Sequence, residues 1–231
     1  SIENLPNIKV VIISHDHYDH LDKSAIKQLD QKVEQFVTPL KVGKHLEKWG
    51  VSSTKITELN WWQATQLDSL EITATPAQHY SGRGLFDRDE TLWASWVIKS
   101  KQVNIFFSGD SGYFSGFKDI GDKYGPFDIT MIETGGYSEM WTDIHMLPKQ
   151  SLQAHLDLRG KAMLPIHNGT FDLALHDWFD PFESITKLAE ENSVQLLTPI
   201  FGEPVSIVSP TRTTAWWRDM SLSTEFEVVV R

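Results

Sequence analysis

The segment from Ser14 to Asp22 restricts the possible folds of this chain more than any other part of the sequence. It reads SHDHYDHLD, so three histidines and three aspartates fall within the eight residues after Ser14. The segment directly follows Ile8–Ile13, a short run rich in β-branched residues, which is typical of a buried strand. Imidazole nitrogens and carboxylate oxygens are usual ligands of zinc and related metals. The sequence therefore predicts a strand that ends in a metal-binding loop.

Within this loop the spacing divides the ligands between two ions. Alternate residues of an extended backbone point the same way, so His15 and His17 can bind one metal. Asp19 and His20 lie just beyond them and can turn toward a second metal. A solvated polar loop is the alternative interpretation, and the density of histidines at the end of a buried strand favours the metal site.

More residues of metal-binding type stand just beyond other predicted strands. They are Asp110 after Val103–Gly109, His167 after Ala162–Ile166, and His79 a short turn after Leu70–Thr75. Ligand sites of α/β sheets gather at the carboxyl ends of strands, so these side chains are expected to meet the first loop. Taken singly, each histidine would be read as a structural or surface residue; together with the first motif they indicate one metal centre.

Short apolar runs alternate with helical patterns along the chain, which indicates a layered α/β fold. Strands are predicted at Ile8–Ile13, Phe36–Val37, Lys55–Leu59, Leu70–Thr75, Leu92–Ile98, Val103–Phe107, Ile129–Glu133, Ala162–Ile166, Val194–Leu197, Val205–Val208 and Glu225–Val230. Helices are predicted at Asp22–Leu29, Leu40–Trp49 with Gly50 as its cap, Phe114–Lys123, Pro148–Leu158 with Gly160 ending it, and Phe182–Asn192. The 231 residues are expected to form one domain.

The composition limits the possible partners. The formal net charge of −10 disfavours a nucleic acid partner and hence a nuclease, because an acidic surface repels phosphates. There is no cysteine, which excludes disulfides, thiolate ligands and a cysteine nucleophile. Apolar side chains near the motifs can form a pocket or touch a lipid surface, with core packing as the alternative. They are Trp61, Trp62, Tyr80, Phe86, Tyr113, Phe114, Tyr137, Met140, Trp141 and Met146.

The pattern His15-x-His17-x-Asp19-His20, followed by the later ligands in this order, resembles the signature of the metallo-β-lactamase superfamily. The resemblance implies a four-layer αββα sandwich holding two metal ions. It also implies the ligand sets: His15, His17 and His79 for one zinc, Asp19, His20 and His167 for the second, and Asp110 as the bridge. In that family several strands precede the first motif, so this chain is expected to lack its N-terminal strands and to need a partner segment or second subunit over the sheet.

Other segments resemble the branch of the superfamily that contains N-acylphosphatidylethanolamine-hydrolysing phospholipase D. The resemblance extends from about Lys9 to Glu203 and rests on Pro76–Ser81, Ser95–Trp96, Phe107–Tyr113, Tyr124–Asp128 and Ile166–Phe171. It implies a phosphodiesterase of phospholipase D type acting on N-acylphosphatidylethanolamine-like lipids. A lactone or β-lactam ring hydrolase on the same site is the alternative, and a non-catalytic metal-binding domain is a more distant one.

The expected reaction uses a hydroxide shared by the two metals. Binding to the metals is expected to lower the pKa of the parent water toward about 7. Asp19 is expected to orient the hydroxide and His145 to give a proton to the leaving group. Two zinc ions are the expected cofactors, with iron or manganese as alternatives. The expected partner is a small-molecule or lipid substrate, with peripheral membrane contact and a soluble or cytoplasmic location. Candidates for supporting the ligands are Asp16, Asp22, Ser111 and Thr170.

Overall fold

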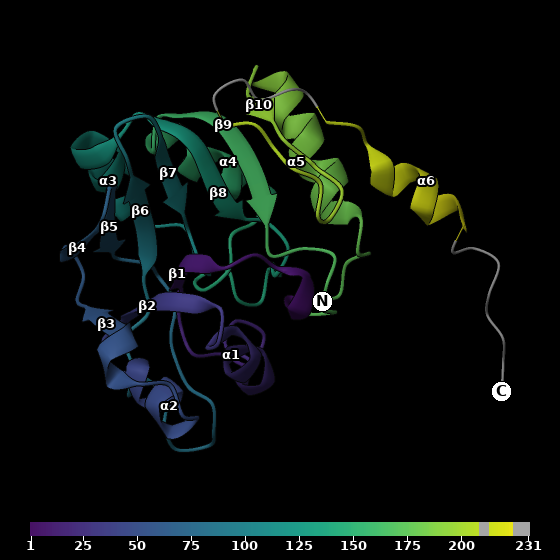
Figure 1. The fold of residues 1–231 in the computed structure, drawn as a ribbon. Helices are drawn as coiled ribbons and strands as arrows, with labels where there is room; N and C mark the ends of the chain where they lie inside the picture. Colours follow the sequence, from purple (N-terminus) through teal and green to yellow (C-terminus); the bar gives the residue numbers. More distant parts are fainter. Residues whose placement is uncertain (208–212, 224–231) are drawn as a thin grey trace, which may run out of the picture. The chain divides into compact units, whose positions relative to one another are not determined.

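The computed structural model describes residues 1–207 and 213–223 of the chain, which forms two compact units (Figure 1). The first unit comprises Ser1–Gln102 and Phe106–Gly112. The second comprises Val103–Ile105 and the chain from Tyr113 onward. Strand β7 (Asn104–Phe107) contributes residues to both units. That residues 1–231 make one domain stays a prediction.

The first unit begins with a parallel sheet in the order β1-β2-β3. Its strands are β1 (Ile8–Ile12), β2 (Val33–Pro39) and β3 (Ile56–Leu59). Parallel neighbours need crossover connections, which α1 (Lys23–Leu29) and α2 (Gly43–Lys48) provide. Two short 3₁₀ turns, η1 (Ile2–Asn4) and η2 (Ser53–Lys55), complete this part. The carboxyl end of β1 opens directly into the loop that begins at Ile13.

The alternating side chains of β2 build the core of the first unit on both faces of this sheet. Phe36 packs with Ile26 of α1 and Leu46 of α2 in one buried cluster. Val37, its neighbour, packs instead in a second cluster with Ile72 and Trp96. Successive strand residues point to opposite faces, so the helices cover one face and a further set of strands covers the other. This packing fixes the end of β1, from which the predicted metal-binding loop extends.

That further set is an antiparallel array of β4 (Ala64–Leu67), β5 (Leu70–Thr75) and β6 (Ser95–Lys99). Strand β5 pairs with both neighbours, and its last residue lies opposite Ser95. The chain leaves β5 at this point and reaches His79 four residues later. The ends of β1, β5 and β7 therefore supply all the predicted ligands of the first unit.

The second unit is built on parallel strands in the order β10-β9-β8. They are β8 (Phe127–Glu133), β9 (Gly160–Ile166) and β10 (Gln195–Leu196). The helices of this unit are α3 (Gly116–Tyr124), α4 (Pro148–Asp157), α5 (Asp180–Glu191) and α6 (Trp216–Ser223). The last pair of the β8–β9 register joins the final residues of the two strands, so the residues that follow them start side by side. Among the described residues, no helix is long and apolar enough to cross a membrane.

Several predicted boundaries differ from the structure for identifiable reasons. Helix α2 is shorter than predicted, because Lys41 has a φ of 69° that no α-helix accommodates. Gly160 opens β9 instead of ending α4; Arg159, with a φ of 58°, makes that turn. Strand β4 and helix α6 were not predicted. Residues 205–207 form no strand, and the rest of that prediction, with Glu225–Val230, lies outside the described residues.

Candidate metal centre

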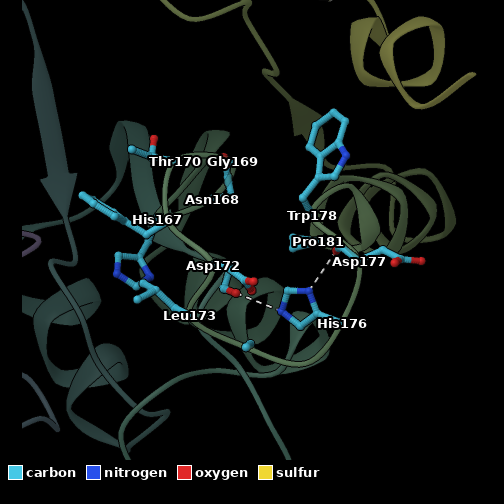
Figure 2. Close-up of a pocket in the computed structure, with 13 residues that line it drawn as sticks. His167, Asn168, Gly169, Thr170, Asp172, Leu173, His176, Asp177, Trp178 and Pro181 are labelled. Carbon is cyan, nitrogen blue, oxygen red and sulfur yellow. Dashed lines mark hydrogen bonds between the residues drawn. The ribbon is translucent and has the colours of Figure 1, made fainter. Parts of the chain in front are cut away.

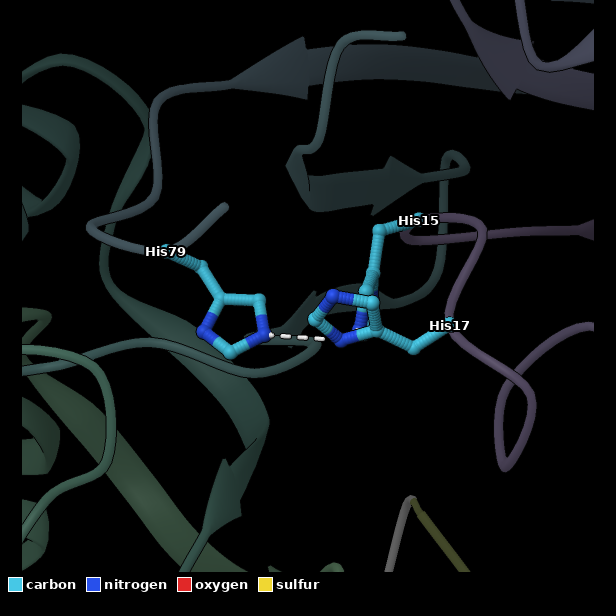
Figure 3. Close-up of side chains that lie close together, drawn as sticks. All are labelled: His15, His17 and His79. Atoms are coloured by element: carbon cyan, nitrogen blue, oxygen red, sulfur yellow. Dashed lines mark hydrogen bonds between the residues drawn. The ribbon is translucent and has the colours of Figure 1, made fainter. Parts of the chain in front are cut away.

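Three histidines of the first unit point their ring nitrogens at one another (Figure 3). Nε2 of His15 lies 2.9 Å from Nδ1 of His17. Nε2 of His79 lies 3.3 Å from the same Nδ1 of His17. The two loops that supply them are 62 residues apart in the sequence, so only the tertiary fold brings them together.

These three nitrogens fit a metal ion. Ligands about 2.0–2.1 Å from a tetrahedral zinc lie roughly 3.3 Å from one another, close to the two spacings just given. Burial lowers the pKa of His15 well below its usual value, and it also lowers the pKa of His17. Both rings are therefore neutral near pH 7, which is the form that binds a metal.

Asp110 lies beside this group with a buried carboxylate. Its Oδ2 is 3.8 Å from Nε2 of both His15 and His79, and 3.1 Å from Nε2 of His20. His20 Nε2 is also 3.3 Å from Oδ2 of Asp19. Burial lowers the pKa of His20, but hydrogen bonds to the two carboxylates outweigh it and raise the pKa to about 10. Six of the seven predicted ligands thus converge within the first unit.

The approach of the Asp110 loop to the first loop depends on a glycine. Gly109 has a φ of 57°, and a Cβ on it would lie 2.6 Å from the Cβ of Ser14. The Ser14 hydroxyl in turn lies 2.9 Å from Nδ1 of His15, the ring nitrogen that faces away from the other ligands. A partner on that second nitrogen fixes the orientation of a ligating imidazole.

The four predicted supporting residues have different positions. Asp22 caps helix α1 by accepting from the Ala25 amide, so its role is structural. The Ser111 hydroxyl accepts from the Gln78 amide and ties the His79 turn to the Asp110 loop. Asp16 belongs to the first loop and is buried. Burial raises the pKa of its carboxyl, but hydrogen bonds from His45, Gly82 and Thr91 outweigh it and hold the pKa below its usual range.

The seventh predicted ligand, His167, belongs to the second unit and directly follows β9. Its Nδ1 lies 3.9 Å from Oε1 of Glu133, and that same oxygen lies 2.6 Å from Nδ1 of His145. The rings of His145 and His167 stack with centroids 5.5 Å apart. Sequence reasoning did not select Glu133, although an acid at the end of the buried strand β8 satisfied the rule used for the other ligands.

The second unit also contains a cavity of about 400 Å³ that His167 helps to line (Figure 2). Thr170, the fourth candidate for supporting the ligands, is on its wall. His176 also lines the cavity, and its Nε2 is 2.9 Å from the carbonyl oxygen of Gly135. Phe171 is a further wall residue and is 58% exposed.

The apolar residues expected around the motifs do not share one environment. Phe86 is 94% exposed and Met140 is 70% exposed, whereas Met146 is fully buried. Trp61 is held in the first unit by a hydrogen bond from its ring nitrogen to the carbonyl oxygen of Trp93. Some of these side chains therefore belong to the core, as the core-packing alternative predicted, and others are exposed on the surface.

Comparison with known proteins identifies the family of the chain. The family model that describes a β-lactamase superfamily domain matches residues 1–168. An uncharacterised protein of Mycobacterium tuberculosis is 44% identical over 218 residues, which cover 93% of this chain and 58% of the relative. N-acyl-phosphatidylethanolamine-hydrolyzing phospholipase D 1 of Caenorhabditis elegans is 32% identical over 203 residues, covering 82% of this chain and 57% of the relative. The chain thus spans less than two thirds of the length of these relatives.

A solved structure of Igni18, a metallo hydrolase from Ignicoccus hospitalis, superposes with a TM-score of 0.68. The two are 23% identical, and the match covers 85% of this chain and 78% of that chain. At this identity the likeness concerns the fold alone, and it confirms the predicted α/β class. That N-terminal strands are missing stays a prediction. Because the family model covers most of the sequence and the fold agrees with it, the chain belongs to the β-lactamase superfamily.

Proposed function

We propose that this chain is the metal-binding part of a hydrolase that uses two divalent metal ions. The observation that carries the proposal is the convergence of six imidazole and carboxylate side chains in the first unit. A set of neutral nitrogens and carboxylate oxygens suits zinc, and also iron or manganese. The metals, when bound, would supply a hydrolytic nucleophile at neutral pH and stabilise negative charge on the substrate.

The proposed ligands follow the superfamily pattern. His15, His17 and His79 would hold one ion, Asp19 and His20 would hold the other, and Asp110 would contact both. This division is supported by the position of Asp110 Oδ2, which is within 3.8 Å of ring nitrogens from both groups. His167 is proposed as a ligand of the second ion from the resemblance alone.

Asp19, in addition to its role as a ligand, and His145 would act on the attacking water and the leaving group. We assign Asp19 to orient the attacking water, because its carboxylate lies at the edge of the ligand cluster and is partly accessible. His145 would donate a proton to the leaving group. Its Nδ1 is directed at Glu133, so in the imidazolium form Nε2 would carry the proton that is donated.

The proposed substrate is a phosphodiester of the N-acylphosphatidylethanolamine type. Water would cleave the bond from phosphorus to the ethanolamine oxygen, giving a phosphatidic acid and an N-acylethanolamine. Support comes from the Caenorhabditis elegans relative, whose name gives this activity, and from exposed apolar side chains such as Phe86 and Phe171. Hydrolysis of a lactone or β-lactam ring is the alternative, since the same ligands serve both reactions.

The test is a parallel assay of metal-analysed protein on bis(p-nitrophenyl) phosphate and on a chromogenic lactam. Phosphodiester turnover that scales with about two bound metals, and is lost in Asp110→Asn, is the expected result. Ring opening without phosphodiester turnover would replace the proposed substrate class by the alternative. Full metal occupancy with neither activity would contradict the hydrolase proposal for this chain.

A further inference from the structure

The loop from Ser14 to Asp22 has no regular secondary structure, so its carbonyl oxygens need partners outside a sheet or helix. Two of them accept short hydrogen bonds from the same nitrogen of Arg83, which also lies 3.5 Å from the carbonyl oxygen of His17. Nη1 of Arg83 donates to the carbonyl oxygen of Asp16 at 2.6 Å and to that of Leu21 at 2.7 Å. The two carbonyls lie on either side of His17, Asp19 and His20 in the sequence. One guanidinium nitrogen therefore fixes the span of backbone that carries these three proposed ligands.

Aromatic rings hold the guanidinium of Arg83 in place. Its central carbon lies 4.1 Å from the centroid of the Tyr18 ring and 5.2 Å from that of Trp49. Tyr18 belongs to the metal-binding loop itself, and Trp49 directly follows α2. A planar, delocalised cation can stack on rings and still donate within its plane, which the ammonium of a lysine cannot do.

Asp16, which belongs to the metal-binding loop, in turn holds the segment that carries Arg83. Its buried carboxylate accepts from the Gly82 amide at 2.8 Å and from the Thr91 hydroxyl at 2.9 Å. These two residues lie at the start and end of the segment that carries Arg83, so Asp16 closes the base of that segment. His45 of α2 approaches the same carboxylate at 3.1 Å. The interior of the segment is fixed by Asp87, which accepts from the amides of Arg83 and Gly84.

We propose that Arg83 and Asp16 are a reciprocal pair of positioning residues for the metal centre. Asp16, in the metal-binding loop, shapes the segment 82–91; Arg83, in that segment, shapes the metal-binding loop. Neither side chain belongs to the proposed ligand set, and their effect reaches the metals through the backbone. The inference rests on the proposed function, because it concerns how the ligands of that centre are held in place.

The test measures metal binding directly, by competition of metal-free protein with a chromophoric zinc chelator and by the absorption spectrum of the cobalt(II) form. Arg83→Met is expected to weaken zinc binding about 10–100-fold, the usual effect of losing an outer partner of a metal site. It is also expected to change the cobalt spectrum, which reports ligand geometry. Arg83→Lys should recover part of the affinity, since it restores a donor without the planar fork.

Two matched variants separate positioning from general damage. Leu85→Ser lies in the same segment, but this side chain is 91% exposed. Arg159→Met removes another guanidinium bound to backbone carbonyls, among them that of Gly125 at 3.1 Å, in the second unit. Both should bind zinc like the unchanged protein. Asp16→Asn should resemble Arg83→Lys, because the amide oxygen still accepts from Gly82 while its NH₂ group replaces an acceptor.

The outcomes distinguish this inference from the proposed function. If the unchanged protein binds no metal, both the positioning role and the hydrolase proposal are rejected. If it binds about two metals and a folded Arg83→Met has the same zinc affinity and cobalt spectrum, the positioning role is overturned and the hydrolase proposal stands. Should Arg83→Met fail to fold, Arg83→Lys decides: unchanged affinity and spectrum reject the role, and an altered spectrum at unchanged melting temperature supports it.

Discussion

In the second unit, Oε1 of Glu133 lies 2.6 Å from Nδ1 of His145, and the glutamate side chain is fully buried. Glu133 is also held through its backbone, because its main-chain carbonyl oxygen accepts a hydrogen bond from the Ser151 hydroxyl of α4 at 2.8 Å. A carboxylate held in this way orients the ring and accepts the proton on Nδ1, so in the imidazolium form the proton on Nε2 is the one that can be transferred. Glu133 and His145 therefore form a pair suited to proton donation through Nε2.

This pair predicts a dependence on the leaving group. His145→Ala should lower kcat roughly 100-fold for a phosphodiester with an alkyl alcohol leaving group, which needs a proton. It should have little effect with bis(p-nitrophenyl) phosphate, whose p-nitrophenolate leaves without one. Glu133→Gln should cause a smaller loss with the same selectivity, because the amide oxygen can still accept from Nδ1 but holds the protonated ring less strongly than a carboxylate does. Equal losses on the two substrates would exclude His145 as the proton donor.

Sequence reasoning selected the candidate ligands because each followed a strand with a clear pattern. Strand β5 was predicted with the boundaries that the structure has, and His79 followed from it. The candidate ligands could then be selected from their order and residue types, without knowledge of side-chain geometry. The strand-end rule also applied to Glu133, which was overlooked because no histidine accompanied it in the sequence.

Arg83 and Asp16 could not be identified in the same way. The contacts of Arg83 are to backbone carbonyls, which every residue possesses, so no residue type in the metal-binding loop signals a partner. Asp16 was a candidate only by its proximity to the ligands, and its partners Gly82 and Thr91 lie 66 and 75 residues away. Helix α2 was predicted too long because the left-handed conformation of Lys41 has no sequence signal as strong as a glycine.

Asp110 is the proposed shared ligand of both ions, so Asp110→Asn should reduce binding from about two metals per chain to about one or fewer. Metal analysis after dialysis gives the stoichiometry. The same variant should lose most of the stabilisation that zinc provides, which is about 2.7 kcal/mol when free zinc is 100-fold above its Kd. Thermal unfolding with and without a chelator measures this difference. Asp122→Asn, which affects an exposed carboxylate paired with Lys118, should retain both metals.

Gly109→Ala should destabilise the protein and weaken metal binding together. The new Cβ would meet Ser14 at 2.6 Å in a backbone with a φ of 57°, so overpacking of about 1–3 kcal/mol adds to a conformational cost of about 1 kcal/mol. Gly50→Ala is the matched comparison, because Gly50 has a φ of 107° with no atom within 4 Å of the added Cβ. Urea unfolding and zinc competition should both separate the two variants. Equal behaviour would mean that close approach to Ser14 is unimportant.

His155 gives the fold a predictable response to acid. The side chain is buried in α4 with Nδ1 2.7 Å from the Thr130 hydroxyl, and burial lowers its pKa from 6.5 to about 4. Between these values the unfolded chain binds more protons than the folded one. The stability contributed by neutral His155 is therefore complete above about pH 6.5 and is lost as the pH falls toward 4.

Lowering the pH from 7.5 to 5.0 should accordingly cost roughly 2 kcal/mol of unfolding free energy through this residue. Urea unfolding at the two pH values measures the loss in the unchanged protein and in His155→Gln, which keeps a polar partner for Thr130 but does not titrate. Other groups titrate in both proteins, so their effects cancel in the comparison. The variant should be less stable at pH 7.5 but lose less on acidification, and identical losses in the two proteins would show that His155 is not the acid-sensitive group.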